Sequence, residues 1–168
     1  MGTITFGSFP RSGNHFLEHI FSKTLVDCRI VYLEHLIYPL AVEKNVVTTI
    51  RNPLECVPSW IVKMDDSRID RAEKVLEWYV AYYEKVKQLD IVVLPFEQLV
   101  CDPLLCINYT YQKYGLEPLQ SLDYDLSTGF QDPTKDKSKY DEIIQEMQSA
   151  PSFSRAMSLF EELCVPVG

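Results

Sequence analysis

The chain has 168 residues, of which 46% are apolar and 24% charged, and its 16 basic and 24 acidic residues give a net charge of −8. This composition is typical of one globular domain spanning residues 1–168 and argues against a disordered chain. The acidic balance also argues against a nucleic-acid polymer as partner, because such binding needs a broad basic surface. It leaves room for one local basic pocket that binds a small anion.

Neither a membrane span nor a secretory signal is visible in the sequence. The most apolar stretches are short and carry charges, whereas a spanning helix needs ~20 apolar residues, and Met1 leads directly into a strand-like run. The five cysteines are odd in number and include no C-x-x-C pair, which favours reduced thiols. We therefore expect a cytoplasmic protein.

The first half of the chain alternates short β-branched runs with longer helical periods. Apolar residues recur at helical spacing from Phe16 to Leu25. Pro53 suits the first turn of a later helix, in which Pro58 is a potential kink. We expect strands over Ile4–Ser8, Arg29–Leu33 and Val46–Ile50, and helices over residues 14–26 and from Pro53 towards Met64.

The second half contains the clearest helical pattern, an apolar stripe over residues 69–88. Asp102 and Pro103 are typical of an N-cap followed by a first-turn proline, and Gly115 is typical of a helix end. We expect a buried strand over Ile91–Leu94, a helix from Pro103 to Gly115, a polar stretch over residues 118–139, and helices at about 140–149 and 152–164.

Strands separated by helices predict a parallel sheet with right-handed crossovers. We expect an α/β fold of three layers, with a P-loop-like parallel sheet of about four strands in the order 2-3-1-4 and helices on both faces. Such sheets bind ligands at the carboxyl ends of their strands. The loops at that edge are therefore the first candidates for a functional site.

The loop after the first strand has the features of an anion cradle. A turn of small residues points backbone N–H groups at one spot, and the N-terminus of the next helix adds partial positive charge. Arg11 adds forked donors suited to phosphate or sulfate. The chain has Ser12, Gly13 and Asn14 where a Walker A loop needs glycine, lysine and a hydroxyl residue, which disfavours an ordinary ATP or GTP hydrolase. A structural turn with a solvated arginine is the alternative.

A second arginine is expected at the same edge of the sheet. Arg51 ends the strand Val46–Ile50, and Ser59 lies about two turns into the helix that follows. Two arginines that converge on one edge suit a ligand with two separate phosphates. The alternative for Arg51 is a salt-bridged strand end.

These segments resemble the sulfotransferases that use 3′-phosphoadenosine 5′-phosphosulfate (PAPS). Residues 9–16 are similar to that family's loop for the 5′-phosphosulfate, and residues 50–59 to its 3′-phosphate motif, with Arg51 and Ser59 at the family spacing. Residues 95–103 and 114–116 resemble later segments of the family. The resemblance implies sulfuryl transfer from PAPS, without a metal, to an acceptor hydroxyl of a glycan or of a small alcohol or phenol.

The resemblance also implies roles for the residues of the loop. Ser12, Gly13, Asn14 and His15 would contact the 5′-phosphate and the sulfuryl oxygens. Arg11 stands where many members have lysine. Because arginine stays protonated, its role would be electrostatic, holding charge on the bridging oxygen and the leaving phosphate.

Three further residues are weaker candidates for contact with the donor. Phe16 stands where many members place an aromatic residue against the adenine, although a core position in the first helix is the alternative. Lys137 and Lys139 lie in the late polar stretch, where the family often covers the 3′-phosphate and the adenine. The family's Arg-Lys-Gly form is absent there, and a solvated mixed-charge loop is the alternative.

The general base for this transfer is expected after the second strand. His35 resembles the catalytic histidine of the cytosolic branch of the family, and its imidazole titrates near neutral pH. Glu34 is the adjacent alternative, and strand alternation lets only one of the two side chains point at the substrate. The remaining alternative is that both are ordinary polar residues at a strand end. His15, Glu18 and His19 also match an H-x-x-E-H zinc pattern, which we discount because no third ligand is identifiable.

Two other function classes stay open at this point. One is a nucleotide-dependent phosphoryl-transfer enzyme on a related scaffold, and the other is a non-catalytic module that retains the nucleotide pocket. Because the rest of the chain is acidic, it should repel polyanionic acceptors. A neutral or cationic acceptor is therefore the better hypothesis.

Overall fold

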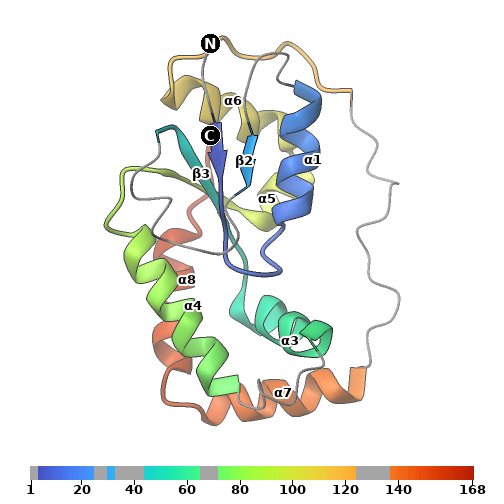
Figure 1. Cartoon of the computed structure of the whole chain (residues 1–168), viewed down its shortest axis with the longest axis vertical. Helices are drawn as coiled ribbons and strands as arrows, with labels where there is room; N and C mark the ends of the chain where they lie inside the picture. Colours follow the sequence, from blue (N-terminus) through green and yellow to red (C-terminus); the bar gives the residue numbers. More distant parts are fainter. Residues whose placement is uncertain (1–3, 25–29, 33–43, 65–71, 124–136) are drawn as a thin grey trace.

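The computed structural model describes residues 4–24, 30–32, 44–64, 72–123 and 137–168, and its centre is a parallel sheet (Figure 1). The four strands lie in the order β2-β1-β3-β4. They are β1 (Ile4–Phe6), β2 (Ile30–Tyr32), β3 (Val46–Ile50) and β4 (Val92–Pro95). All of the pairings are parallel, so the carboxyl ends of the strands share one edge.

This order corrects the expected order 2-3-1-4. In the structure β1 pairs with β2 on one side, where Ile4 lies opposite Ile30, and with β3 on the other, where Thr5 lies opposite Val46. Two of the three consecutive pairs, β1 with β2 and β3 with β4, are therefore neighbours, which is the common arrangement for consecutive strands, whereas β2 and β3 lie on either side of β1. Strands β1 and β3 are neighbours in both orders, so the correction leaves the loops of Arg11 and Arg51 side by side.

Helices cover both faces of the sheet, as the pattern predicts. Side chains alternate along the strands, so Val46 and Ile50 point into one core whereas Val47 points into the other. One core includes residues of α3 (Pro53–Met64), α4 (Ala72–Val86), α7 (Lys137–Ser149) and α8 (Phe153–Leu163). The other includes residues of α1 (Asn14–Thr24), α5 (Phe96–Cys101) and α6 (Pro103–Lys113).

Most helix boundaries follow the local signals in the sequence. The Asp102 side chain accepts a hydrogen bond from the Leu105 amide at 3.1 Å, and Pro103 occupies the first turn of α6. Gly115 then adopts a φ of 68° after that helix. The short helix α5 was not expected from the sequence. None of the described helices is both long and apolar enough to cross a membrane.

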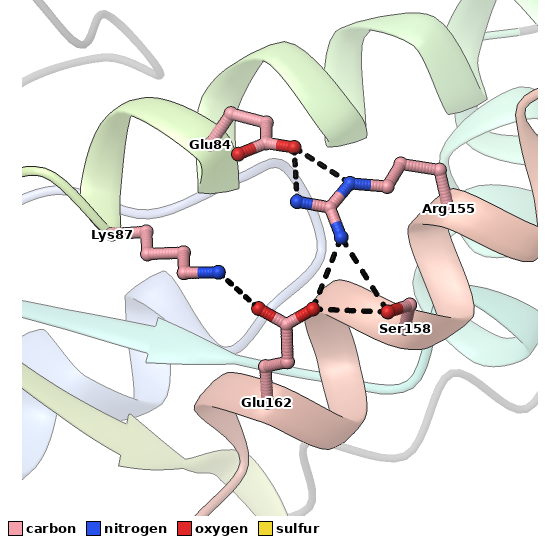
Figure 2. A network of polar contacts seen from close by, with 5 residues as sticks. All are labelled: Glu84, Lys87, Arg155, Ser158 and Glu162. Carbon is pink, nitrogen blue, oxygen red and sulfur yellow. Dashed lines mark hydrogen bonds and ion pairs between the residues drawn. The ribbon is translucent and has the colours of Figure 1, made fainter.

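A network of charged side chains joins α4 to α8 on the outside of the domain (Figure 2). Arg155 donates to Glu84 through Nε at 2.6 Å and to Glu162 through Nη1 at 3.0 Å. Lys87 and the Ser158 hydroxyl also donate to Glu162, and the donors from Lys87, Ser158 and Arg155 lower the pKa of Glu162 to about 2. Each exposed pair contributes little alone, but together they link the two helices that lie side by side in Figure 1.

Candidate active site at the carboxyl edge of the sheet

The loop between β1 and α1 reverses the chain through two unusual backbone conformations. The Ser12 amide donates to the Phe9 carbonyl at 3.2 Å, which closes a turn with Pro10 and Arg11 at its centre. Arg11 has a φ of 62°, as the third residue of a type II turn requires. Gly13 has a φ of 97°. The hydrogen bond from the Leu17 amide to the Gly13 carbonyl belongs to the first turn of α1, whose N-terminus is therefore at this edge.

Arg51 joins the end of β3 to this loop. Its Nη1 donates to the Arg11 carbonyl at 3.2 Å, while its Nε and Nη2 contact the Glu55 carboxylate at 2.9 and 2.7 Å. The Arg51 side chain is only 18% exposed, whereas that of Glu55 is 51% exposed. Arg51 therefore does end its strand in an ion pair, but it also fixes the main chain of the neighbouring loop.

Arg11 reaches across to the helix that follows β3. Its Nε donates to the Ser59 hydroxyl at 3.0 Å, and Ser59 is buried in α3. The structure thus brings together two segments that are separate in the sequence. One is the loop after β1 with Arg11, Ser12 and Gly13, and the other follows β3 and contains Arg51 and Ser59. The guanidinium groups of Arg11 and Arg51 therefore lie on segments that follow two adjacent strands.

Phe96 belongs to this site although the sequence analysis gave it no role. Its ring lies under the Arg51 guanidinium, with 4.6 Å from the guanidinium carbon to the ring centroid. A Cβ atom added at Gly13 would overlap the same ring. The available signal was its place immediately after β4, at the carboxyl edge of a strand.

Buried hydroxyl groups support the loops from below. The Thr49 hydroxyl donates to the Ser12 carbonyl at 2.5 Å, and the Tyr79 hydroxyl donates to the Arg51 carbonyl at 3.0 Å. Burial raises the pKa of Tyr79 far above its usual value and that of the neighbouring Cys56 thiol to about 12. These groups therefore stay protonated near neutral pH, and Cys56 is not a thiolate nucleophile.

The other predicted residues are placed less decisively. His15 is exposed, with its Nδ1 atom 3.8 Å from Glu18. Phe16 is buried in the core below α1 and meets Phe96 edge-on, with ring centroids 6.2 Å apart. Among the described residues, no group of three potential ligand side chains could hold a metal ion. Lys139 is exposed on α7, whereas the side chains of Asn14 and Lys137, together with residues Glu34 and His35, lie outside the described part.

The comparisons with known proteins concern the fold. No protein-family model matches the sequence, and no curated protein matches it either. The fold is nevertheless sulfotransferase-like. It is similar to the crystal structure of mouse sulfotransferase SULT7A1 complexed with PAP, with a TM-score of 0.53 and 13% sequence identity over 95% of this chain and 88% of that chain.

Proposed function

We propose that this protein is a PAPS-dependent sulfotransferase whose donor site is the edge formed by the β1 and β3 loops. The observation that carries the proposal is the direct connection of two arginines. Arg51 donates to the carbonyl of Arg11, and Arg11 donates to Ser59. The loop also ends at a helix N-terminus, which favours an anion. The sulfotransferase fold, in a neighbour crystallised with PAP, supports the same conclusion.

The donor set fits a nucleotide with two separate phosphate groups. Arg51 and Ser59 would hold the 3′-phosphate, while Ser12, Gly13, Asn14 and His15 would face the 5′ side. The exposed carboxylate of Glu55 now occupies two of the Arg51 donors. Exposed ion pairs of this kind contribute about 0–1 kcal/mol, so a phosphate with more charge could replace Glu55 at small cost.

The proposed chemistry needs few groups from the protein. PAPS supplies the activated sulfuryl group, whose bond to the phosphate oxygen breaks as the acceptor oxygen bonds to sulfur. Arg11 would stabilise the charge left on that phosphate oxygen. His35 would take the acceptor proton, with Glu34 as the alternative base. The proposed acceptor is a neutral or cationic hydroxyl compound, either a glycan or a small alcohol or phenol, and the proposed location is the cytoplasm.

Binding of adenosine 3′,5′-bisphosphate (PAP) tests the donor site directly. At about 100 times its dissociation constant, PAP should add ~2.7 kcal/mol of stability in a thermal-shift assay. ATP or AMP at the same concentration should stabilise the protein much less. Arg51→Ala should weaken PAP far more than AMP, because AMP lacks the 3′-phosphate. Lys44→Ala is the matched control, since it removes the same charge from an exposed residue before the opposite end of β3.

Each result separates one function class from the others. The absence of a selective shift with PAP would contradict the proposal, and a preference for ATP with magnesium would favour the phosphoryl-transfer enzyme. Sulfuryl transfer from PAPS to a panel of neutral alcohols, phenols and sugars then tests catalysis. Selective PAP binding without transfer to any of them would favour the non-catalytic module.

A further inference from the structure

Three tyrosines of α4 place their hydroxyl groups at successive positions along the end of β3. The Tyr82 hydroxyl lies 3.2 Å from the hydroxyl of Thr48, a residue in the middle of β3. The Tyr83 hydroxyl donates to the Thr49 carbonyl at 2.8 Å. The Tyr79 hydroxyl donates to the carbonyl of Arg51, where the strand has ended. The three side chains are almost completely buried, at 0 to 3% exposure.

Tyr83 also reaches the anion loop itself. Its hydroxyl lies 3.4 Å from the Ser12 hydroxyl, while Thr49, the residue whose carbonyl it binds, donates to the Ser12 carbonyl. Ser12 is fully buried. Tyr83 and Thr49 therefore connect the loop to the strand from beneath, on the side away from solvent.

Tyr79 acts at the point where β3 becomes α3. The last ladder pair of β3 joins Ile50 to Pro95, so the Arg51 carbonyl lies beyond the sheet. The next residue, Asn52, already accepts from the amides of the first helical turn. The Tyr79 hydroxyl donates to the Arg51 carbonyl at 3.0 Å, and the Cys56 thiol contacts the same carbonyl at 3.9 Å. The Arg51 guanidinium extends from this main chain to the Arg11 carbonyl.

We propose that Tyr79 and Tyr83 are positioning residues for the donor nucleotide, and that each acts on a different part of it. Tyr82, in contrast, only stabilises the fold. This inference rests on the proposed function. Tyr83 acts through Ser12 on the 5′ side of the nucleotide. Tyr79 acts through Arg51 on the 3′-phosphate. The tyrosines would not touch the nucleotide, because they lie below the loops.

Three phenylalanine variants on one helix distinguish these roles, and isothermal titration of each with PAP and with AMP provides the measurement. Tyr79→Phe should weaken PAP about fivefold, since loss of one hydrogen bond has about that effect, and should weaken AMP by less. Tyr83→Phe should weaken both nucleotides about fivefold, with the ratio of their affinities unchanged. Tyr82→Phe is the matched control, and it should lower the melting temperature without changing either affinity.

Hydrogen–deuterium exchange without ligand tests the same idea independently of nucleotide binding. Tyr83→Phe should speed exchange in residues 9–16, and Tyr79→Phe in residues 50–54, whereas Tyr82→Phe should do neither. If all three variants change exchange and affinity in parallel, the tyrosines only stabilise the fold and the inference is wrong. If the wild-type protein fails to bind PAP, the proposed function fails, and the exchange pattern alone then supports or overturns the positioning roles.

Discussion

Gly13 is the position at which one added methyl group should disturb the candidate site most. Its φ of 97° is strained for any other residue, which costs about 1–2 kcal/mol. The new Cβ would also overlap the Phe96 ring, which lies against Arg51 and Phe16. Displacement of such a packed ring costs typically about 1–3 kcal/mol. We therefore expect Gly13→Ala to lower the free energy of unfolding by about 2–5 kcal/mol.

Gly115→Ala is the matched control for the backbone term. Gly115 also has a positive φ, at 68°, but a Cβ added there meets nothing within 4 Å. Urea unfolding followed by circular dichroism gives both values, and the expected cost of Gly115→Ala is about 1–2 kcal/mol. The excess in Gly13→Ala then measures the contact between the loop and Phe96.

The double variant Gly13→Ala with Phe96→Leu completes the test, because a smaller side chain removes the overlap. Relative to Phe96→Leu alone, the added Gly13→Ala should lower the free energy of unfolding only by the backbone term, about 1–2 kcal/mol. Equal costs for Gly13→Ala and Gly115→Ala would refute the reasoning, since Phe96 would then not be held against the loop. A double variant that shows no recovery would refute it as well.

Three further predictions concern the fold around the site. Asp102→Ala should lower the free energy of unfolding by about 1 kcal/mol through loss of the N-cap of α6, whereas Asp90→Ala, which breaks an exposed ion pair, should have little effect on the urea midpoint. Gln98→Ala removes two hydrogen bonds to the Val167 main chain, at 2.6 and 2.8 Å, and should increase hydrogen exchange at the last residues. Glu162 has its pKa lowered from 4.5 to about 2, so its stabilisation is complete above pH 4.5 and is lost as the pH falls towards 2. The difference in melting temperature between wild type and Glu162→Gln should therefore shrink over that range, and a difference independent of pH would contradict the ion-pair network.

Local signals in the sequence predicted the described strands and every described helix except α5, together with the meeting of the Arg11 and Arg51 segments. Asp102, Pro103 and Gly115 act within a few residues of the helix ends that they define, so their meaning needs no tertiary context. The convergence of Arg11 and Arg51 needed one additional rule, that parallel strands end at a shared edge. That rule is independent of the strand order, which explains why the order was wrong while the convergence was right.

The parts that could not be predicted depend on contacts between distant residues. Nothing near β1 indicates whether β2 or β4 pairs with it, because all of the strands are short and apolar. An apolar stripe such as that of α4 predicts a buried helix face, and its tyrosine rings do lie in the core. The same stripe could not reveal that the hydroxyl groups of Tyr79 and Tyr83 meet the ends of other elements. An apolar stripe indicates which residues are buried. The hydrogen-bond partner of a hydroxyl group at the end of a buried ring depends instead on the element that packs against that ring.

The arrangement also explains how an acidic chain holds two guanidinium groups at one edge without a strong penalty. Arg51 donates to the carbonyl oxygen of Arg11, so the dipole of that loop and the carboxylate of Glu55 offset its charge. The Phe96 ring provides a further favourable surface for the same cation. Of these partners, Glu55 alone is an exposed charge that an anion could replace. The backbone contacts and the tyrosines below them would stay in place. The site would therefore be organised before the proposed nucleotide binds, and little binding energy would be lost in ordering the two loops.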